Sequence, residues 1–551
     1  MNTSTLLLHP REMPGVDPAN SARGVVEALE AARAVTPASA LSVAQSRQHV
    51  GRALCHTTGI NGTFKYNGFC WDAADDNTSA WAEATPDTGG WHPQGLTASH
   101  DAHPGGTVDG HHLYMASWFY GYGKDEGDRD HRARISLVRS TGTDWSYGHV
   151  LLVRPTGSRT NPDFEAVDKV HADGMAWYGN RLFVANGGEL QIYDLNHLWK
   201  MSSLSGRVGV GGGPSSAAHH QWALPMIARY GTRTKAQEAA SGNPHPRACE
   251  PSSRACLGSL SLDRSGPTPR LVSGEYWSNR RNSATGKLEA SHPAHLVKWP
   301  LEHIGEGGTA AVRAVSAHTT NVRQVQGVAT DGTHYYVSGQ CPDGYLGDAD
   351  TSDQGSYSCI WQARPGISPT VLTRSPALTQ NLSYAHTSGR LWGSNELTGK
   401  RTVFSLRPRE ADAALPLSND HSALCAGVGS GIANGAKVIQ WGCNHAQDER
   451  WLFEDTTDSH GNRAYFLRNA HSGKCMGTGS SLAPGAGIIQ YTCNGAVDEK
   501  WWWTPQTGEL RNVYSGHCLG IGANATKGSQ LIQWTCNGAA DEKWSRVARN
   551  V

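Results

Sequence analysis

The sequence predicts an all-β fold built from two repetitive parts. Turns are frequent, because 64 Gly and 26 Pro occur among the 551 residues. The stretches between the turns are short and rich in β-branched and aromatic residues, with 19 Trp in the chain. A loose repeat occupies most of the chain and a stricter one its end, and such repetition is typical of all-β architectures that close on themselves.

The composition excludes several classes of protein. The 48 Lys and Arg residues balance 48 Asp and Glu, so the formal net charge is zero and no basic surface for nucleic acid is expected. No apolar run approaches the roughly 18 residues of a membrane span. We find no GxSxG, HExxH, P-loop or strand-linked GxGxxG motif. We therefore expect a monomer without a cofactor, a nucleic-acid partner or a membrane insertion.

The twelve cysteines fall into six neighbouring pairs, and all three pairs after residue 417 have a separation of 18 residues. The sequence has no CxxC motif, which argues against a zinc ribbon. We therefore predict six disulfides and an oxidising, extracellular location. Each loop of 18 residues contributes about 3 kcal/mol in the chain-entropy model. The predicted pairs are Cys55–Cys70, Cys249–Cys256, Cys341–Cys359, Cys425–Cys443, Cys475–Cys493 and Cys518–Cys536.

Residues 1–50 differ from the rest of the chain. Apolar residues recur at helical spacing from about residue 22 onward, with Asp17 or Ser21 as the candidate N-cap. No strand signal is evident, so we interpret this part as a partly helical N-terminal extension. Its start has no basic residues before a short apolar run, so it is not typical of a signal peptide.

Residues 51–407 contain the loose repeat. Each copy has a short apolar strand, a Gly-containing turn, a second strand and a small polar cluster, as in HADGMAWYGNRLFVANGGELQIYDL. This part resembles a β-propeller of about five blades, in which radial repetition buries the faces of each blade. A β-sandwich or an irregular β-domain is the alternative. Residues 408–416, rich in Pro, Ala and charge, are interpreted as a linker.

Residues 417–551 hold three copies of one unit, which end at Trp451, Trp501 and Trp544. Each copy has the frame Cys, Gln-Trp or Gln-Tyr, Cys-Asn and Trp, as in HCLGIGANATKGSQLIQWTCNGAADEKW. This part strongly resembles the ricin-type β-trefoil lectin family, which also includes carbohydrate-binding modules similar to family 13. The resemblance implies three lobes around a shared core that contains the three terminal Trp residues.

The resemblance also implies one sugar site in each lobe. In such a site an aromatic ring stacks on the apolar face of a sugar, and polar side chains bind its hydroxyl groups. A purely structural role is the alternative for the rings. The matching residues are the rings of Trp441, Tyr491 and Trp534, the amides of Gln440, Gln490 and Gln533, and the carboxylates of Asp448, Asp498 and Asp541.

Two departures from the family pattern affect these sites. The Gln-x-Trp of the family is Glu-x-Trp in all three copies. The family usually has an acidic residue two positions after the first Cys, where this sequence has Gly427, Gly477 and Gly520. The second departure puts a galactose-type specificity in doubt, although the neighbouring Asp of each copy is a candidate to compensate.

Polar residues next to the propeller strands are the candidate catalytic groups. They are His171 and Asp173 in HADG, Glu275 in SGEYW and Glu396 in GSNE. Two carboxylates that face a sugar would suit acid–base cleavage of a glycosidic bond. The aromatic neighbours of Glu275 would keep its carboxyl neutral, as an acid requires. The alternative is that these residues only cap turns.

A metal site is a further alternative, because the chain is rich in histidine. It could be formed for instance by His100, Asp101 and His171. Adjacent histidines on a strand point to opposite faces and chelate poorly, so we predict no metal.

Three functions are compatible with these observations. The first is a secreted carbohydrate-active enzyme, a glycoside hydrolase or polysaccharide lyase that the trefoil holds on a polysaccharide. The second is a non-catalytic lectin or adhesin that binds glycans through both domains. The third is a protein-binding or toxin-like module in which the trefoil serves cell attachment. We favour the first, because trefoils of this type commonly accompany an enzyme.

Overall fold

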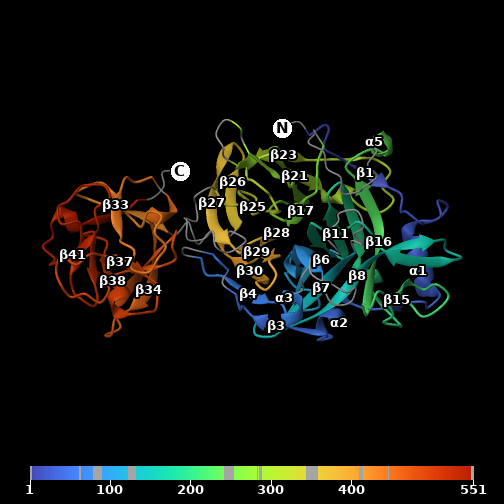
Figure 1. Cartoon of the computed structure of the whole chain (residues 1–551), viewed down its shortest axis with the longest axis horizontal. Coiled ribbons are helices and arrows are strands. Elements are labelled where there is room, and N and C mark those ends of the chain that lie inside the picture. The colour runs from blue at the N-terminus through green and yellow to red at the C-terminus, as the bar shows by residue number, and fades with distance from the viewer. Residues whose placement is uncertain are drawn as a thin grey trace. The chain divides into compact units, whose positions relative to one another are not determined.

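Strands dominate every part of the chain that the computed structural model describes (Figure 1). The all-β prediction is therefore confirmed. One unit comprises mainly residues up to Leu406, and the other comprises mainly residues from Arg407 onward. The described residues are 3–56, 58–60, 64–77, 90–121, 132–240, 254–281, 283, 288–342, 358–408, 414–444 and 446–547.

The first unit contains five four-stranded antiparallel arrays, which we call sheets I to V. Parallel pairing between the last strands of sheets I and II, together with short strands from the start of the chain, joins sheets I, II and V into one larger sheet. The strands of each sheet follow one another along the chain, except that β4, from the beginning of the chain, completes sheet V. Sheet I has β5 (Trp91–Ala98), β6 (His112–Tyr120), β7 (Ala133–Ser140) and β8 (Trp145–Gly157). Sheet II has β10 (Gly174–Tyr178), β11 (Arg181–Asn186), β12 (Glu189–Asp194) and β16 (Trp222–Gly231). Sheet III has β17 (Ser259–Asp263), β18 (Arg270–Gly274), β21 (Ala294–Pro300) and β23 (Ser316–Thr320). Sheet IV has β24 (Gly327–Thr330), β25 (Tyr335–Gln340), β26 (Ser358–Arg364) and β27 (Ile367–Ser375). Sheet V has β28 (Thr379–Ala385), β29 (Arg390–Asn395), β30 (Thr402–Leu406) and β4 (Asn67–Cys70).

The first strands of the five sheets contact one another in a ring. β5 contacts β10, β10 contacts β17, β17 contacts β24, β24 contacts β28, and β28 contacts β5. Five four-stranded sheets arranged around such a ring are the architecture of a five-bladed β-propeller. The strand-turn-strand repeat of the sequence corresponds to the first two strands of each blade.

The first fifty residues pack on this unit. α1 (Ala22–Ala31) begins at Ser21, whose side chain accepts a hydrogen bond from the Gly24 amide at 3.0 Å, as the sequence predicted. The expectation that this part has no strand was wrong. β1 (Leu7–Arg11) pairs with β16 and with β22 (Val312–Arg313), and β3 (His49–Ala53) pairs with β4 and β8. These strands are short and form only against distant partners, so the local sequence carries little sign of them.

The remaining elements of this unit are short. None of the helices in the described part of the chain is long and apolar enough to cross a membrane. They are α2 (Ala40–Gln45), α3 (Ala73–Asn77), α4 (Ser99–Ala102), α5 (Lys235–Ala240), β2 (Thr36–Pro37), β9 (Pro162–Ala166), β13 (Trp199–Lys200), β14 (Val208–Gly209), β15 (Ser216–Ala217), β19 (Asn279–Arg281), β20 (Leu288–Ala290), η1 (Leu195–His197) and η2 (Leu301–His303).

The second unit is a threefold repeat of short strands around one core. The indole nitrogens of Trp451, Trp501 and Trp544 each donate to a backbone carbonyl at 2.9 Å, and all three rings are buried as predicted. The strands are β31 (Leu415–Asn419), β32 (Cys425–Gly427), β33 (Ile439–Trp441), β34 (Arg450–Thr457), β35 (Arg463–Asn469), β36 (Cys475–Gly477), β37 (Ile489–Tyr491), β38 (Lys500–Thr504), β39 (Glu509–Asn512), β40 (Cys518–Gly520), β41 (Ile532–Trp534) and β42 (Trp544–Arg546). A short 3₁₀ turn precedes the last Trp of each lobe: η5 (Gln447–Glu449), η6 (Val497–Glu499) and η7 (Ala540–Glu542).

Five of the six predicted disulfides are present in the described residues: Cys55–Cys70, Cys341–Cys359, Cys425–Cys443, Cys475–Cys493 and Cys518–Cys536. Cys256 is also disulfide-bonded. Its predicted partner, Cys249, lies outside the described residues.

His100 and Asp101 lie beyond the end of β5, in a buried cluster. The Asp101 carboxylate accepts hydrogen bonds from Thr97 and Ser383 at 2.8 Å, and His100 Nε2 lies 2.7 Å from the Ser383 hydroxyl. Burial raises the pKa of Asp101 to about 6 and lowers the pKa of His100 to about 3. His171 precedes the start of β10, whereas His100 and Asp101 follow the end of the neighbouring strand β5. The ligand atoms of the three residues therefore do not converge, and the metal site considered above is not formed.

The neutral His100 makes stability depend on pH. Its pKa in the folded protein is about 3, below the unfolded value of 6.5. The unfolded chain therefore gains a proton first, and the folded state loses stability as the pH falls from 6.5 toward 3. We predict that His100→Gln makes this loss shallower, by up to about 1.4 kcal/mol per pH unit between pH 6 and 4. The raised pKa of Asp101 gives stability the opposite pH dependence. Asp101 is present in both proteins, so its effect cancels when the two are compared. Urea unfolding at several pH values measures the slope. His460→Gln, at an exposed histidine, is the control, and an unchanged slope in His100→Gln would contradict the assignment.

Candidate functional site

The polar clusters of the propeller gather at one end of the inner ring. Each first strand pairs antiparallel with its second strand, so the start of one lies beside the end of the other: Gly174 opposite Ala185, Ser259 opposite Gly274 and Thr379 opposite Asn395. Residues before the first strands and after the second strands therefore lie at the same end. Three of these groups are described below.

Glu396, which follows β29, forms the centre of the first group. Its carboxylate accepts hydrogen bonds from Gln380 at 2.8 Å and Gln94 at 3.0 Å, and it lies 3.1 Å from His92 Nδ1. Burial alone would raise the pKa of Glu396, but the hydrogen bond and charge of His92, with His171 and Gln94, lower it below its usual value. The carboxylate is therefore ionised at neutral pH and remains 22% exposed, as a base or nucleophile requires.

His171 and Asp173 form the second group, directly before β10. His171 Nδ1 lies 2.7 Å from the Asp173 carboxylate, a contact that fixes the orientation of the imidazole ring. The ring of Phe119 stacks on His171 at 3.9 Å and on His92 at 4.9 Å. The stack connects this pair to Glu396, so the structure brings three of the four predicted catalytic residues into one cluster.

Glu275 does not fit its predicted role as a catalytic acid. Its side chain is 1% exposed. It accepts hydrogen bonds from the backbone amides of Cys256 at 3.0 Å and His295 at 2.9 Å, and from the Trp277 indole at 3.2 Å. The carboxylate also pairs with His295 Nδ1 at 2.7 Å. These contacts make Glu275 a structural residue that holds neighbouring strands together.

His92, Gln94 and Gln380 were missed in the sequence analysis. They lie within strands that the sequence identifies mainly by their apolar residues, and Gln94 contacts Glu396 across 302 positions. One signal was nevertheless present. The start of β5 reads His-Pro-Gln-Gly and the start of β10 reads His-Ala-Asp-Gly. This shared pattern places a histidine and a second polar residue before the same glycine in two blades.

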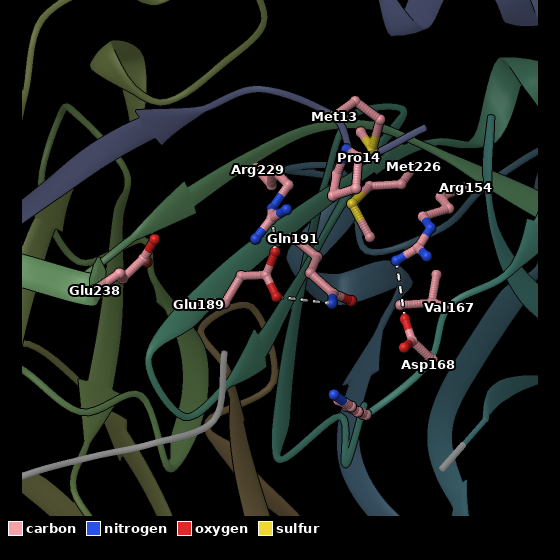
Figure 2. A pocket seen from close by; sticks show the side chains of 11 residues that line it. Met13, Pro14, Arg154, Val167, Asp168, Glu189, Gln191, Met226, Arg229 and Glu238 are labelled. Atoms are coloured by element: carbon pink, nitrogen blue, oxygen red, sulfur yellow. Dashed lines mark hydrogen bonds and ion pairs between the residues drawn. The ribbon is translucent and has the colours of Figure 1, made fainter. Parts of the chain in front are cut away.

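A separate hollow lies beside β12 and β16, with a volume of about 210 Å³ (Figure 2). Its charged groups form pairs: Arg154 with Asp168 at 2.9 Å, and Arg229 with Glu189 at 2.5 Å. Figure 2 shows both arginines directed at their carboxylate partners. We assign no ligand to this hollow, because its arginines already bind carboxylates of the protein itself.

The second unit exposes one aromatic ring in each repeat. Trp441, Tyr491 and Trp534 are 48%, 47% and 45% exposed, which is unusual for side chains of this size. Trp441 and Trp534 each lie against a loop glycine of another repeat: a Cβ atom on Gly528 would meet Trp441 at 3.6 Å, and one on Gly485 would meet Trp534 at 3.2 Å. The glycines leave room for one edge of each of these two rings, and about half of each side chain is exposed.

A carboxylate lies beside each position where the sequence departs from the family pattern. A Cβ atom on Gly427 would lie 3.3 Å from Asp448 Oδ2, and the matching distances are 3.6 Å for Gly477 and Asp498, and 4.0 Å for Gly520 and Asp541. Loop amides hold two of the carboxylates, since Asp498 accepts from Ser480 at 2.9 Å and Asp541 from Ala523 at 3.0 Å. The Asp of each 3₁₀ turn thus occupies the space beside the missing acidic side chain.

The predicted sugar contacts of Gln440, Gln490 and Gln533 are wrong. All three side chains are fully buried. Gln533 Nε2 donates to the carbonyls of Ser481 at 2.9 Å and Ala483 at 3.1 Å, Gln490 Nε2 donates to Gly431 at 2.7 Å, and Gln440 Nε2 donates to Asn524. Because strand residues alternate between faces, each Gln points away from the exposed ring beside it and links its repeat to another.

The model of the ricin-type β-trefoil lectin domain matches residues 413–544. This part of the chain is a ricin-type β-trefoil lectin domain. The lectin domain has a threefold core, with one disulfide and one exposed ring in each lobe, and domains of this family bind sugars. No curated protein matches the sequence.

Several solved structures are similar to parts of the chain. The designed threefold-symmetric protein ThreeFoil is 27% identical over 24% of this chain and 98% of its own, with a TM-score of 0.23. A non-toxic homologue of type II RIPs from Momordica charantia, in complex with α-methyl-D-galactoside, is 25% identical over 25% of this chain and 48% of its own, with a TM-score of 0.21. An exo-β-1,3-galactanase from Clostridium thermocellum is 12% identical over 79% of this chain and 80% of its own, with a TM-score of 0.24. Scores this low carry no argument about the whole chain.

The neighbours Gln533 and Trp534 separate stability from binding. We predict that Gln533→Ala lowers the free energy of unfolding by about 1–3 kcal/mol, because two loop carbonyls lose their donor and the buried side chain leaves a cavity. Trp534→Ala leaves stability nearly unchanged, because the ring is exposed, but weakens retention on a glycan. Calorimetric unfolding and retention on immobilised polysaccharides measure the two effects. Equal loss of stability in both variants would contradict this division.

Proposed function

We propose that this is a secreted carbohydrate-active protein whose lectin domain holds it on a glycan, while the propeller acts on the same class of polymer at Glu396. The observation that carries the first part is that every lobe has an exposed aromatic ring and a carboxylate beside its strand glycine. An aromatic face and nearby hydrogen-bond acceptors are what recognition of a sugar requires. The disulfides support secretion, because they persist in oxidising compartments.

Three sites on one rigid domain suit a repetitive ligand. A single shallow site that offers one ring and one carboxylate binds weakly. When one lobe is bound to a polymer, the second binding event becomes intramolecular and the overall affinity rises by orders of magnitude. This favours a polysaccharide over a free monosaccharide as the ligand of the lectin domain.

The chemistry of the propeller follows from the cluster around Glu396. The ionised Glu396 is the candidate base or nucleophile, and the His171–Asp173 pair is the candidate proton donor and acceptor. In hydrolysis Asp173 would serve as the second carboxyl group. In elimination from an acidic sugar, Glu396 or His171 would remove the proton next to the sugar carboxylate, and the glycosidic oxygen would leave. Both routes use the same residues and differ in their products.

A non-catalytic lectin is the second candidate. It is favoured by the position of Glu275, whose contacts with backbone amides remove one of the two glutamates that the sequence offered for catalysis. In this case the cluster around Glu396 binds a sugar without cleaving it.

Glu396→Gln tests the catalytic proposal. We predict that the substitution lowers the release of oligosaccharides at least 100-fold, because an amide cannot act as a base or nucleophile, and leaves retention on the polymer unchanged. Mass spectrometry of products from a panel of plant, fungal and bacterial polysaccharides measures release, and an unsaturated sugar end identifies elimination. Glu302→Gln, at an exposed residue, is the matched control. Retention without any product from the unsubstituted protein would establish the lectin alternative.

A further inference from the structure

Two histidines and an aspartate converge away from the sites described so far. His49 begins β3, Asp75 lies in α3 and His149 lies in β8, and one ligand atom of each lies within 4.8 Å of the others. Asp75 Oδ2 is 3.1 Å from His149 Nε2 and 3.6 Å from His49 Nδ1. The histidines are 100 positions apart in the sequence, so no local motif announces the cluster.

The spacing of these atoms fits a tetrahedral metal ion. Ligand atoms about 2.0–2.2 Å from a zinc ion lie roughly 3.4 Å from one another. The two measured separations, 3.1 and 3.6 Å, lie on either side of this value. Asp72 Oδ2 lies 2.7 Å from His49 Nδ1 but outside the group of converging atoms, so it places a negative charge beside the site.

Surrounding residues orient the donor atoms. The Ser136 hydroxyl lies 2.9 Å from His149 Nδ1, which leaves Nε2 directed at Asp75. Arg134 donates to the other oxygen of Asp75 at 2.7 Å, so Oδ2 is the oxygen turned toward the histidines. Hydrogen bonds like those of Ser136 and Arg134, to the ligand atom that faces away from the ion, are typical of metal centres. Tyr147 donates to Oδ2 itself at 2.7 Å, and a carboxylate oxygen can accept this bond and still bind an ion through its second lone pair.

The cluster has both a closed and an open side. The side chains of Asp75 and His149 are 5% and 6% exposed, whereas those of His49 and Asp72 are 28% and 22% exposed. An ion can therefore enter past His49 and Asp72 and be held against the buried pair. Without an ion, these side chains form hydrogen bonds with one another. When an ion binds, the same nitrogen and oxygen atoms would contact the ion instead.

We propose that His49, Asp75 and His149 bind a divalent transition-metal ion, with the fourth position left to water and the charge of Asp72 beside the site. Imidazole ligands favour zinc and its neighbours in the transition series, whereas calcium and magnesium prefer sites made only of oxygen. The site is independent of the proposed glycan chemistry and would stabilise the meeting point of β3, α3 and β8. It would also correct the expectation, from sequence alone, that the protein holds no metal.

Titration calorimetry with zinc chloride on the full chain, after treatment with EDTA, tests this site. We expect one tight equivalent of zinc in the unsubstituted protein and in His460→Ala, where the histidine is exposed and outside the cluster. We expect binding at least about 100-fold weaker in His49→Ala, since changes merely around a ligand cost 10–100-fold. Asp72→Asn should weaken binding less, because it removes a negative charge beside the site and no ligand.

His49 is partly exposed, so His49→Ala is expected to fold, and circular dichroism checks this. Should it fail to fold, Asp72→Asn carries the test, and cobalt supplies an independent readout. Cobalt bound at a tetrahedral site gives strong visible absorption, which must diminish in Asp72→Asn. The proposal is overturned if the unsubstituted protein takes up no zinc at micromolar concentration, or if the two substitutions in the cluster leave zinc and cobalt binding as in His460→Ala.

Discussion

The close approach of the inner strands around the propeller ring is the constraint on which the rest of the first unit depends. A Cβ atom on Gly174 would lie 2.1 Å from the Leu260 amide nitrogen, and one on Gly327 would lie 2.5 Å from the Gln380 carbonyl oxygen. Real atoms do not approach so closely, so these positions admit only glycine. The ring also has to close, and it does so through β4, which comes from the beginning of the chain and completes the last sheet. The fold therefore joins residues more than 300 positions apart.

This closure determines what the end of the ring can do. Because β28 lies beside β5, Gln380 and Gln94 reach the same carboxylate of Glu396 from two sheets. Glu275 occupies the corresponding place after the second strand of sheet III, yet backbone amides surround it instead of side chains. Two glutamates at equivalent positions thus have different chemistry. One is a partly exposed acceptor held by side chains, and the other is a buried link between strands.

The lectin domain could be predicted from sequence far more completely than the propeller site. Its disulfides and core tryptophans recur at fixed intervals, so each is visible in three local copies. The sequence could not show which of Gln533 and Trp534 is exposed, because strand alternation says only that the two side chains point to opposite faces. The carbonyls that accept hydrogen bonds from Gln533 belong to a loop about fifty residues earlier. His92, and likewise His49 and His149, acquire their partners only through the tertiary fold.

In each lectin lobe the strand position that is usually acidic is glycine, and an aspartate of the 3₁₀ turn lies beside it. This difference affects which sugar a lobe selects more than whether it has a site. Each lobe retains one carboxylate beside its strand glycine, but the carboxylate comes from the 3₁₀ turn instead of the strand. An acidic side chain at Gly427 would meet the Asp448 carboxylate at close range, and two like charges so close would repel each other. The two positions are therefore alternatives, of which a lobe can use only one. A carboxylate held from the turn approaches the sugar from another direction, so different hydroxyl groups come within its reach. We therefore expect these lobes to bind sugars with a selectivity that differs from that of family members with the strand carboxylate.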